Sequence, residues 1–435
     1  MSVISSSWNS IGIIGAGISG VSLARLLKDQ GLHSIVYERN SQPGGLIHCS
    51  LEDGNLFHRV GGHVFNSKNS QVLDWFWGYF DKEKEFIPAK RNAVIFLNGE
   101  FIGYPIEFNL NTLDLLTVSE IREELYILSL DDQLPLERSA NFHDFLLLSF
   151  GKTLCSLYFF PYNTKIWKTD LSTIPLGWLD GKLPMTSPKQ ILNSMDKETK
   201  GDSMVHSSFF YPLRGGSQFI IDRLSDDIHI VQSEISSISV VDGAFVLNNS
   251  PNTRHNKLVY TGDIRELVTI LPSEVLDYFD ICDDEIQQLA SLQSNSTSTM
   301  LCECDSNPYS WVYIPSNSTS IHRIIMTGNF SENNTSPTIQ SGRTTCTIEH
   351  SGYLSRDQMA SESAKLPFNM RPIAYNYCPN SYIVHAMSSK QLLNTIANKL
   401  SSKNFYCLGR FSEWEYFNMD AAIESAMRLA DQLSK

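Results

Sequence analysis

The chain has little that would place it in a membrane, a secretory route or a nucleic-acid complex. No run approaches the roughly 18 consecutive apolar residues of a membrane span. The opening segment, Met1–Trp8, is neither a basic nor an apolar leader. A formal net charge of −13 at pH 7 gives the protein no electrostatic basis for binding the phosphate backbone of a nucleic acid. We therefore expect a cytoplasmic protein that has no membrane span and binds no nucleic acid.

The sequence also lacks the spacing of a metal site. Its eight cysteines are scattered, and the close pair Cys302 and Cys304 has no further ligand motif beside it. We expect reduced, mostly buried thiols and no metal. Repeats are absent too. A length of 435 residues with 42% hydrophobic residues predicts two or three substructures with an ample core.

The most informative feature that is present is the run Gly15-Ala-Gly-Ile-Ser-Gly20. It follows an apolar strand, Ile11–Ile14, and precedes apolar residues at helical spacing. Gly15 permits the tight turn, Gly17 lets the backbone approach phosphates, and Gly20 lets the helix pack on the strand. A second strand, Ser34–Glu38, ends in a carboxylate that can accept hydrogen bonds from ribose hydroxyls. The pattern predicts a dinucleotide site, with a glycine-rich turn in an ordinary strand-helix unit as the alternative.

The order of the predicted elements indicates an α/β fold with interleaved domains. Residues 9–69, 210–265 and 400–435 form a Rossmann-type domain, residues 70–200 a largely helical insertion, and residues 266–399 an antiparallel sheet domain. Strand-like pieces around the turn signal Asn98-Gly99 allow parts of 85–108 to join the sheet. The Ser- and Asn-rich stretches 292–299 and 315–320 are expected to be loops, and Met419–Leu433 a helix.

Five separated segments resemble those of the UDP-galactopyranose mutase family, in the family's order. They are Gly61-Gly-His-Val-Phe-Asn-Ser67, Tyr104-Pro-Ile-Glu-Phe-Asn-Leu110, Tyr162-Asn-Thr-Lys-Ile-Trp167, Val259-Tyr-Thr-Gly-Asp-Ile264 and Gly409-Arg-Phe-Ser-Glu-Trp-Glu-Tyr-Phe-Asn-Met-Asp420. The resemblance spans most of the chain, although residues 185–255 and 265–345 match poorly.

The resemblance implies that the dinucleotide is FAD, active in its reduced form, so that the Rossmann-type domain is an FAD-binding domain. The glycine pair Gly44-Gly45 after the second strand favours FAD over NAD in the same way. The residues implied to bind the cofactor are Gly15, Gly17, Ile18, Ser19, Gly20, Glu38, Arg39, Gly45, Leu46, His63, Val64, Gly409, Met419 and Asp420.

The resemblance also implies a nucleotide-sugar site. The catalytic residues would be His63 beside the flavin, and Arg323 and Arg410 on the pyrophosphate. The residues implied to bind substrate are Tyr162, Lys165, Trp167, Lys182, Glu349, Tyr382, Tyr416 and Asn418. Plainer alternatives stay open: an aromatic core pair for Tyr162 and Trp167, a surface pair with Glu413 or Glu415 for Arg410, and ordinary packing for His63 and Arg323.

The chain departs from the family more at the sugar and nucleotide than at the flavin. Asn418 stands where the family has aspartate, Trp414 where it has tyrosine and Glu415 where it has arginine. Lys182 is the sole counterpart of a second phosphate arginine, and a Tyr-Pro-Ile-Arg tetrad appears as Tyr382-Ile-Val-His385. The departures bear on the identity of the sugar and the base rather than on the reaction.

The implied reaction is an isomerisation. It interconverts the pyranose and furanose forms of UDP-galactose or of a dTDP- or UDP-6-deoxyhexose through a reduced-flavin N5–sugar adduct, without net redox change. The implied setting is furanose biosynthesis for cell-surface polysaccharide, with an external reductant for the flavin and, as is common in the family, a homodimer. The rival function is that of an FAD-dependent oxidase of the protoporphyrinogen or amine oxidase type. The segment Pro212-Leu-Arg-Gly-Gly216 resembles the glycine-pair segment of those oxidases. A flavoprotein that serves only as a binding module has no supporting feature.

Overall fold

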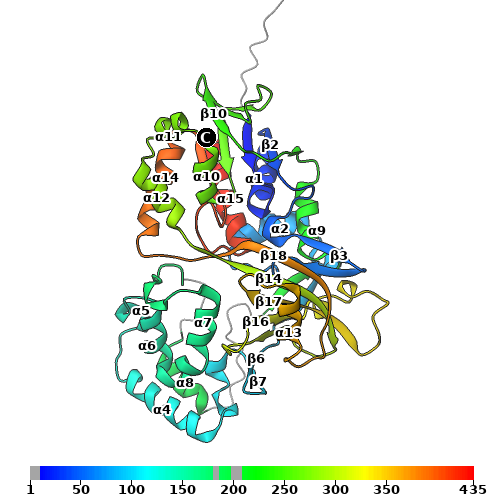
Figure 1. Cartoon of the computed structure of the whole chain (residues 1–435), viewed down its shortest axis with the longest axis vertical. Coiled ribbons are helices and arrows are strands. Elements are labelled where there is room, and N and C mark those ends of the chain that lie inside the picture. Colours follow the sequence, from blue (N-terminus) through cyan, green and yellow to red (C-terminus); the bar gives the residue numbers. More distant parts are fainter. Residues whose placement is uncertain (1–9, 180–185, 197–207) are drawn as a thin grey trace, which may run out of the picture.

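One parallel sheet contains both the first and the last strand of the described residues. The computed structural model describes residues 10–179, 186–196 and 208–435. In this part of the chain a five-stranded parallel sheet has the order β19 (Phe405–Cys407), β13 (Lys257–Tyr260), β1 (Ile11–Ile14), β2 (Ser34–Glu38) and β9 (Ile230–Gln232). Helix α1 (Ile18–Asp29) packs against α15 (Met419–Leu433), so the blue and red segments of Figure 1 lie side by side.

The glycine run folds as its spacing predicts. Gly15 has φ +103°, a conformation that favours glycine. A Cβ on Gly20 would lie 2.0 Å from the carbonyl oxygen of Gly15, so only glycine lets α1 approach the turn this closely. Val21, Leu23 and Leu27 are fully buried and fix α1 on the sheet. The predicted strand, turn, helix and second strand are confirmed, and so is the C-terminal helix.

A helical unit follows, at the lower left of Figure 1. Its helices are α4 (Leu115–Ser129), α5 (Pro135–Arg138), α6 (Phe142–Leu154), α7 (Phe160–Trp167) and α8 (Pro188–Met195). A π-helical segment, Cys155–Phe159, joins α6 to α7. By length and composition the continuous stretch Phe142–Trp167 could cross a membrane, with a mean hydropathy of 1.2 over its most apolar window, although the sequence led us to expect no such stretch. Half of that window is buried within the protein, as in a core helix.

The third unit is a sheet at the lower right of Figure 1. Among the described residues it has seven strands, in the order β18 (Arg371–Ile383), β14 (Ser294–Asp305), β17 (Arg343–Ser351), β16 (Ile321–Ile325), β15 (Trp311–Tyr313), β6 (Ala93–Leu97) and β7 (Glu100–Gly103). All neighbours are antiparallel except β15 and β6. The hairpin β6–β7 turns at Asn98 and Gly99, both at positive φ, as predicted.

One of the two loops predicted from the sequence is a strand in the structure, so that prediction was wrong. The stretch 292–299 contains the first half of β14, because Ser294–Asp305 pairs with β17 on one side and β18 on the other. Thr297, Ser298 and Thr299 are buried there despite their polarity. Pairing on both edges satisfies the backbone and overrides the loop-like composition. The second stretch, 315–320, is a loop as expected.

Shorter elements complete these units. Between β2 and the helical unit lie β3 (Cys49–Glu52), β4 (Asn55–His58), α2 (Ser70–Tyr79), α3 (Lys82–Glu85) and β5 (Phe86–Lys90). Between the helical unit and β14 lie β8 (Ser208–Pro212), α9 (Gly216–Ser225), β10 (Ile238–Val241), β11 (Ala244–Leu247), β12 (Arg254–His255), α10 (Ile264–Ile270), α11 (Ser273–Tyr278) and α12 (Asp283–Ser291). Two further helices are α13 (Arg356–Ser363) and α14 (Ser389–Ser401).

Helix α2 packs with the parallel sheet rather than with the helical unit. Its buried Val72 and Phe76 belong to the same apolar core as Leu23 of α1 and Ile423 of α15. Strands β6 and β7 belong to the seven-stranded sheet. We therefore propose that the helical unit starts after β7, later than the residue 70 suggested by the sequence.

Candidate functional site

A cavity of about 210 Å³ lies between the nucleotide-fold elements and the seven-stranded sheet. Of the residues predicted to form a site, it brings together Leu46, His63, Val64, Arg323, Glu349, Tyr382, Arg410, Tyr416, Asn418, Met419 and Asp420. The wall also contains Val60, Gly62, Asn66, Arg91, Phe209, Trp311 and Ser381. Residues from segments more than 300 positions apart therefore meet in one place.

The N-termini of two helices supply backbone donors. Helix α1 begins after Gly17, and no side chain caps it. Helix α15 begins after Asn418, which makes no side-chain cap bond, and its start lines the cavity. Uncapped N–H groups and the helix dipole favour an anion or a polarised carbonyl at both places.

The dinucleotide end of the site is built closely around glycine. Gly17 and Gly45 pack closely against one another, since a Cβ on Gly45 would lie 3.2 Å from the Cα of Gly17. Gly409 has φ +96°, and a Cβ there would lie 2.6 Å from Ser19 Oγ. Ile18 is the first residue of α1, while Arg39 is exposed just after β2.

Glu38 ends β2 where a ribose-binding acid is expected, and its carboxylate also holds the turn. It is 7% exposed. One oxygen accepts from the backbone N–H of Ala16 at 2.8 Å, and the other from that of Asn40 at 2.9 Å. The ribose contact itself stays a prediction.

The segment with His63 approaches the sheet through two glycines. A Cβ on Gly61 would lie 2.5 Å from Glu349 Oε1, and one on Gly62 would lie 2.6 Å from Ile325. His63 Nε2 lies 2.9 Å from the carbonyl oxygen of Val60, so this nitrogen carries the hydrogen. Burial, with a contribution from Arg410, lowers the pKa of His63 to about 4. Its Nδ1 is therefore an unprotonated acceptor at neutral pH.

Arg323 and Glu349 face one another across β16 and β17. The Arg323 guanidinium pairs with the Glu349 carboxylate through Nε and donates to the Tyr382 hydroxyl at 3.1 Å through an Nη. Burial alone would raise the pKa of Glu349, but Arg323 and the neighbouring His322 hold it well below its usual range. The carboxylate thus stays ionised and fixes the guanidinium in the cavity wall.

Arg410 is oriented by carbonyl groups. Its Nε donates to Phe417 O at 3.0 Å and one Nη to Ser381 O at 3.1 Å, and its guanidinium carbon lies 4.9 Å from the Tyr416 ring centre. The alternative pairing with Glu413 does not occur, because that carboxylate accepts from the Gly409 N–H at 2.6 Å and from Ser425. The positive charge of Arg410 is therefore not offset by Glu413.

An aromatic wall stands beside the arginines. The rings of Tyr382 and Tyr416 stack with centroids 6.0 Å apart. Behind them the Trp167 ring contacts Tyr416 at 5.9 Å, Tyr382 at 6.4 Å and Trp178 at 4.9 Å. Trp167 is 5% exposed, and its indole N–H finds no acceptor among the described residues. Trp167 therefore backs the two tyrosines that line the cavity.

Three other predicted substrate residues are not among the lining residues that the structure describes. The Lys165 ammonium donates to the carbonyls of Ile314, Ser316 and Ile321 and so anchors the 315–320 loop rather than a phosphate. Burial lowers its pKa to about 8. Tyr162 is not among the lining residues, although it is near enough to Arg323 and Tyr382 to interact with them electrostatically, and its ring centroid lies 5.6 Å from that of Tyr313. Lys182 falls outside the described residues.

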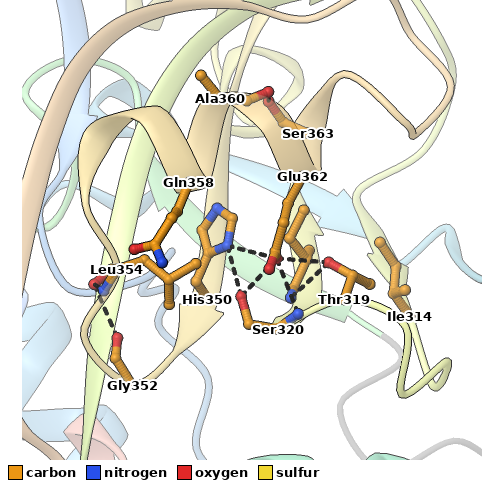
Figure 2. Close-up of polar contacts among 12 residues, drawn as sticks. Ile314, Thr319, Ser320, His350, Gly352, Leu354, Gln358, Ala360, Glu362 and Ser363 are labelled. Carbon is orange, nitrogen blue, oxygen red and sulfur yellow. Dashed lines mark hydrogen bonds and ion pairs between the residues drawn. The ribbon is translucent and has the colours of Figure 1, made fainter.

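A polar network fixes the other end of the same loop, just before Arg323 (Figure 2). The Glu362 carboxylate on α13 accepts from the Ser320 hydroxyl at 2.6 Å and the Thr319 hydroxyl at 2.8 Å. His350 Nδ1 lies 3.0 Å from the Ser320 oxygen and 3.4 Å from the carboxylate. Because the Ser320 hydroxyl donates to Glu362, its oxygen accepts from His350. The loop that leads into β16 is thereby pinned to β17 and α13.

Arg91 is a site residue that sequence reasoning missed. It lines the cavity next to Trp311, and its guanidinium lies 5.1 Å from the Tyr104 ring, 5.0 Å from Trp311 and 5.8 Å from Tyr313. Its Nε has no acceptor among the described residues. A lone arginine before a strand carries no motif, so only the fold reveals it.

With Arg323 and Arg410, Arg91 makes the cavity locally cationic in a chain of net charge −13. The carboxylates in the wall are Glu349, which is paired with Arg323, and Asp420 in the first turn of α15. Such a pocket can hold an anionic ligand against an unfavourable overall field.

Comparisons with known proteins find a family model and several curated relatives. A model described as an NAD(P)-binding Rossmann-like domain matches residues 13–80. A probable UDP-galactopyranose mutase of Klebsiella pneumoniae is 27% identical over 177 residues, 40% of this chain and 44% of that protein. A dTDP-fucopyranose mutase of Escherichia coli is 27% identical over 184 residues, 41% and 46% of the two chains. The matched part thus spans less than half the length of these relatives.

The fold is similar over nearly its whole length to solved structures. A crystal structure of reduced UDP-galactopyranose mutase superimposes with a TM-score of 0.84 at 20% identity, over 98% of this chain and 93% of that one. A putative protoporphyrinogen oxidase from Exiguobacterium sp. 255-15 gives a TM-score of 0.74 at 14% identity, over 98% and 99%. At these identities the likeness concerns the fold alone.

Proposed function

Because the chain belongs to the family of UDP-galactopyranose mutase and dTDP-fucopyranose mutase, we propose that it is a flavin-dependent isomerase of nucleotide sugars. It would interconvert the pyranose and furanose forms of UDP-galactose or of a dTDP- or UDP-6-deoxyhexose. The observation that carries this proposal is one cavity that joins the start of α15 and the His63 segment to Arg323, Arg410 and a tyrosine wall.

FAD fits the residues that are present. The uncapped start of α1 and the glycine turn would hold its pyrophosphate, Glu38 its ribose, and the uncapped start of α15 its flavin ring. Neither Gly17 nor Gly45 carries a Cβ, so no side chain of these residues would block a phosphate at that turn. Reduced FAD would supply the nucleophile for the anomeric carbon.

The arginines would hold the diphosphate. Guanidinium groups bind phosphate through paired, charge-assisted hydrogen bonds. Arg323 is preset by Glu349 and Tyr382, and Arg410 by two carbonyl oxygens, so little ordering is left for the moment of reaction. Both would stabilise the charge that grows on the leaving diphosphate as the bond to the sugar breaks.

The tyrosines and His63 would position the sugar. The stacked faces of Tyr382 and Tyr416 offer an apolar surface for a sugar ring, and Trp167 backs them. His63 Nδ1 can accept a hydrogen bond from a hydroxyl group in the cavity. A fixed sugar orientation selects which hydroxyl closes the ring.

An oxidase function finds less support in the cavity. An amine substrate would be repelled by Arg91, Arg323 and Arg410, and a porphyrinogen would need an apolar wall. The oxidases among the structural neighbours share the fold. The remaining parts of the proposal are an external reductant, a homodimer, a cytoplasmic location and a role in furanose synthesis for cell-surface polysaccharide.

The test is a panel of UDP- and dTDP-sugars incubated with the holoenzyme and dithionite. We expect a furanose product from at least one sugar under reducing conditions and none without reductant. Rapid flavin reduction by a substrate, with no furanose from any sugar, would favour an oxidase and refute the isomerase.

A further inference from the structure

A second cavity, of about 250 Å³, lies beside helices α12 and α14. The two helices pack together at the left of Figure 1, and the rest of the wall comes from the segment after β18 and from Thr169 and Thr173, which follow α7. Among the described residues it shares no lining residue with the first cavity, which is formed around Arg323 and Arg410. The proposed chemistry therefore leaves the second cavity without a role.

His385 is a buried ring in the wall of the second cavity that lacks hydrogen-bond partners. The residue is 9% exposed, and its Nε2 is fully covered without a partner in the described part of the chain. Its Nδ1 makes no hydrogen bond within that part either. A neutral imidazole has one donor and one acceptor nitrogen. Leaving both unpaired costs folding free energy, which points to a ligand that completes them.

Helix α14, 13 residues long, begins at the same cavity. Ser388 and Ser389 line the wall there. The Ser388 side chain makes no cap bond, and the Ser389 hydroxyl donates to the carbonyl oxygen of Ala386 at 2.8 Å. The first-turn N–H groups lack intrahelical acceptors, and the helix dipole places partial positive charge beside them. The start of α14 therefore favours an anion in the cavity that His385 lines.

The charges around the second cavity also favour an anion. Burial, with a contribution from Lys390 in the first turn of α14, lowers the pKa of His385 to about 4. The ring is therefore neutral at pH 7 and keeps one N–H to donate. No carboxylate belongs to the lining residues that the structure describes. The carboxylates of Asp170 and Asp284, next to lining residues, accept hydrogen bonds from within their own helices.

We propose that the second cavity binds the phosphate group of a small phosphate monoester. The phosphate oxygens accept from the first-turn N–H groups of α14, from the Ser388 hydroxyl and from the ring N–H of His385. Lys390 supplies a positive charge beside them. Donors that come from a helix end and from a separate ring suit a tetrahedral anion better than a planar carboxylate.

The rest of the wall suits an organic part that carries hydroxyl groups. The amides of Gln288 and Gln293 and the hydroxyl of Thr173 are exposed at the cavity and can bond hydroxyl groups. Leu292 and Leu392 add apolar surface. A sugar phosphate combines these features, whereas inorganic phosphate would use only the end of the cavity at α14.

The test titrates the oxidised holoenzyme with galactose 1-phosphate, inorganic phosphate and galactose by calorimetry at neutral pH, with UDP present to fill the first cavity. We expect galactose 1-phosphate to bind with a dissociation constant of about 1 mM or below, inorganic phosphate about tenfold more weakly and galactose not measurably. Binding should persist in Arg410→Ala, because that change touches only the first cavity.

Tryptophan fluorescence locates the ligand. The His385 ring stacks on Trp178, with centroids 6.1 Å apart and planes at 10°. A ligand on His385 should change the fluorescence of the wild type. In Trp178→Phe the change should be lost, while calorimetry still detects binding.

Ser388→Asp is the variant that separates binding from folding. A carboxylate in the first turn of a helix is favoured by the helix dipole, so this variant should be at least as stable as the wild type. The same carboxylate repels a phosphate, so galactose 1-phosphate should bind at least tenfold more weakly. His385→Leu should weaken binding about tenfold through the lost donor.

A matched pair of lysine variants separates the local charge from the net charge. Lys390→Ala should weaken binding of galactose 1-phosphate about threefold to tenfold. Lys365→Ala, at an exposed position just after α13, removes the same unit of charge and should bind as the wild type does.

Three results would overturn the assignment. They are galactose 1-phosphate that binds only when UDP is absent, an affinity that is unchanged in Ser388→Asp, and inorganic phosphate that binds as tightly as the ester. None of these measurements requires turnover, so the second cavity and the proposed isomerase activity are tested separately.

Discussion

Arg410 is the residue whose position bears most directly on the proposed leaving group, the diphosphate. Its guanidinium is held by Phe417 O and Ser381 O, which orient it without neutralising its charge. Arg410→Ala should therefore lower kcat/KM for the nucleotide sugar by about 10- to 100-fold, the loss of one or two charge-assisted hydrogen bonds. Steady-state kinetics and the flavin absorbance of the purified protein check this.

The FAD content should be unchanged in Arg410→Ala. Arg428→Ala, on an exposed part of α15, is the matched control and should leave kcat/KM unaltered. Loss of FAD from the Arg410 variant would place the guanidinium in the cofactor's own shell and contradict the role in holding the diphosphate.

Trp167 acts through the tyrosines it supports. It is almost fully buried against Tyr382, Tyr416 and Trp178. Trp167→Ala should lose turnover, retain FAD and lower the free energy of unfolding by about 3–5 kcal/mol, because a large cavity opens. Trp167→Phe should keep most of the stability and lose less activity. Full activity in Trp167→Ala would mean that Trp167 only fills the core and does not support the substrate site.

The predictability of the site differs from residue to residue for physical reasons. Arg410 and Tyr416 lie in a continuous motif, so their meeting in the cavity could be predicted from the resemblance. Lys165 lies in an equally good motif, yet its ammonium is taken by three carbonyls of a loop 150 residues away. A motif specifies which residues are present, whereas the partner of a long flexible cation depends on tertiary packing.

At the scale of the element, the polar network on α13 holds the loop before Arg323. Burial alone would raise the pKa of Glu362, but hydrogen bonds from His350, Ser320 and Thr319 lower it to about 2. A carboxyl with a depressed folded-state pKa contributes stability above its unfolded value near 4.5, and this contribution is lost as pH falls toward 2.

The Glu362→Gln variant should accordingly be less stable than the wild type by about 1–2 kcal/mol at pH 7, after allowing for solvent screening. The difference should shrink between pH 4.5 and 2 as the wild-type carboxyl takes up its proton. Urea unfolding at several pH values measures it. A difference that does not change with pH would mean that shape, not charge, holds the loop.

Elements were predictable where one face is buried and the pattern is local. Strand β1, helix α1 and helix α15 follow from their apolar spacing and from the glycine turn. The first half of β14 was missed because Ser and Asn outnumber Thr there and favour loops, and its neighbours β17 and β18 lie about 50 and 80 residues further along the chain. Pairing with distant strands is a property of the whole sheet and leaves no local trace.

At the scale of the whole molecule, the proposed function requires a chain of net charge −13 to admit a dianionic substrate. At low ionic strength the field of the whole surface reaches about 30 Å and repels the ligand, while at about 0.1 M it is screened beyond about 10 Å. Arg91, Arg323 and Arg410 act inside the cavity, within that shorter range.

The association rate constant of UDP-galactose with the oxidised holoenzyme should therefore rise several-fold between 10 mM and 100 mM salt, measured by stopped-flow fluorescence. Two monovalent salts with different anions separate screening from competition for the arginines. A rate that falls steadily with salt would show that the cationic cavity, not the acidic surface, governs the approach of the ligand.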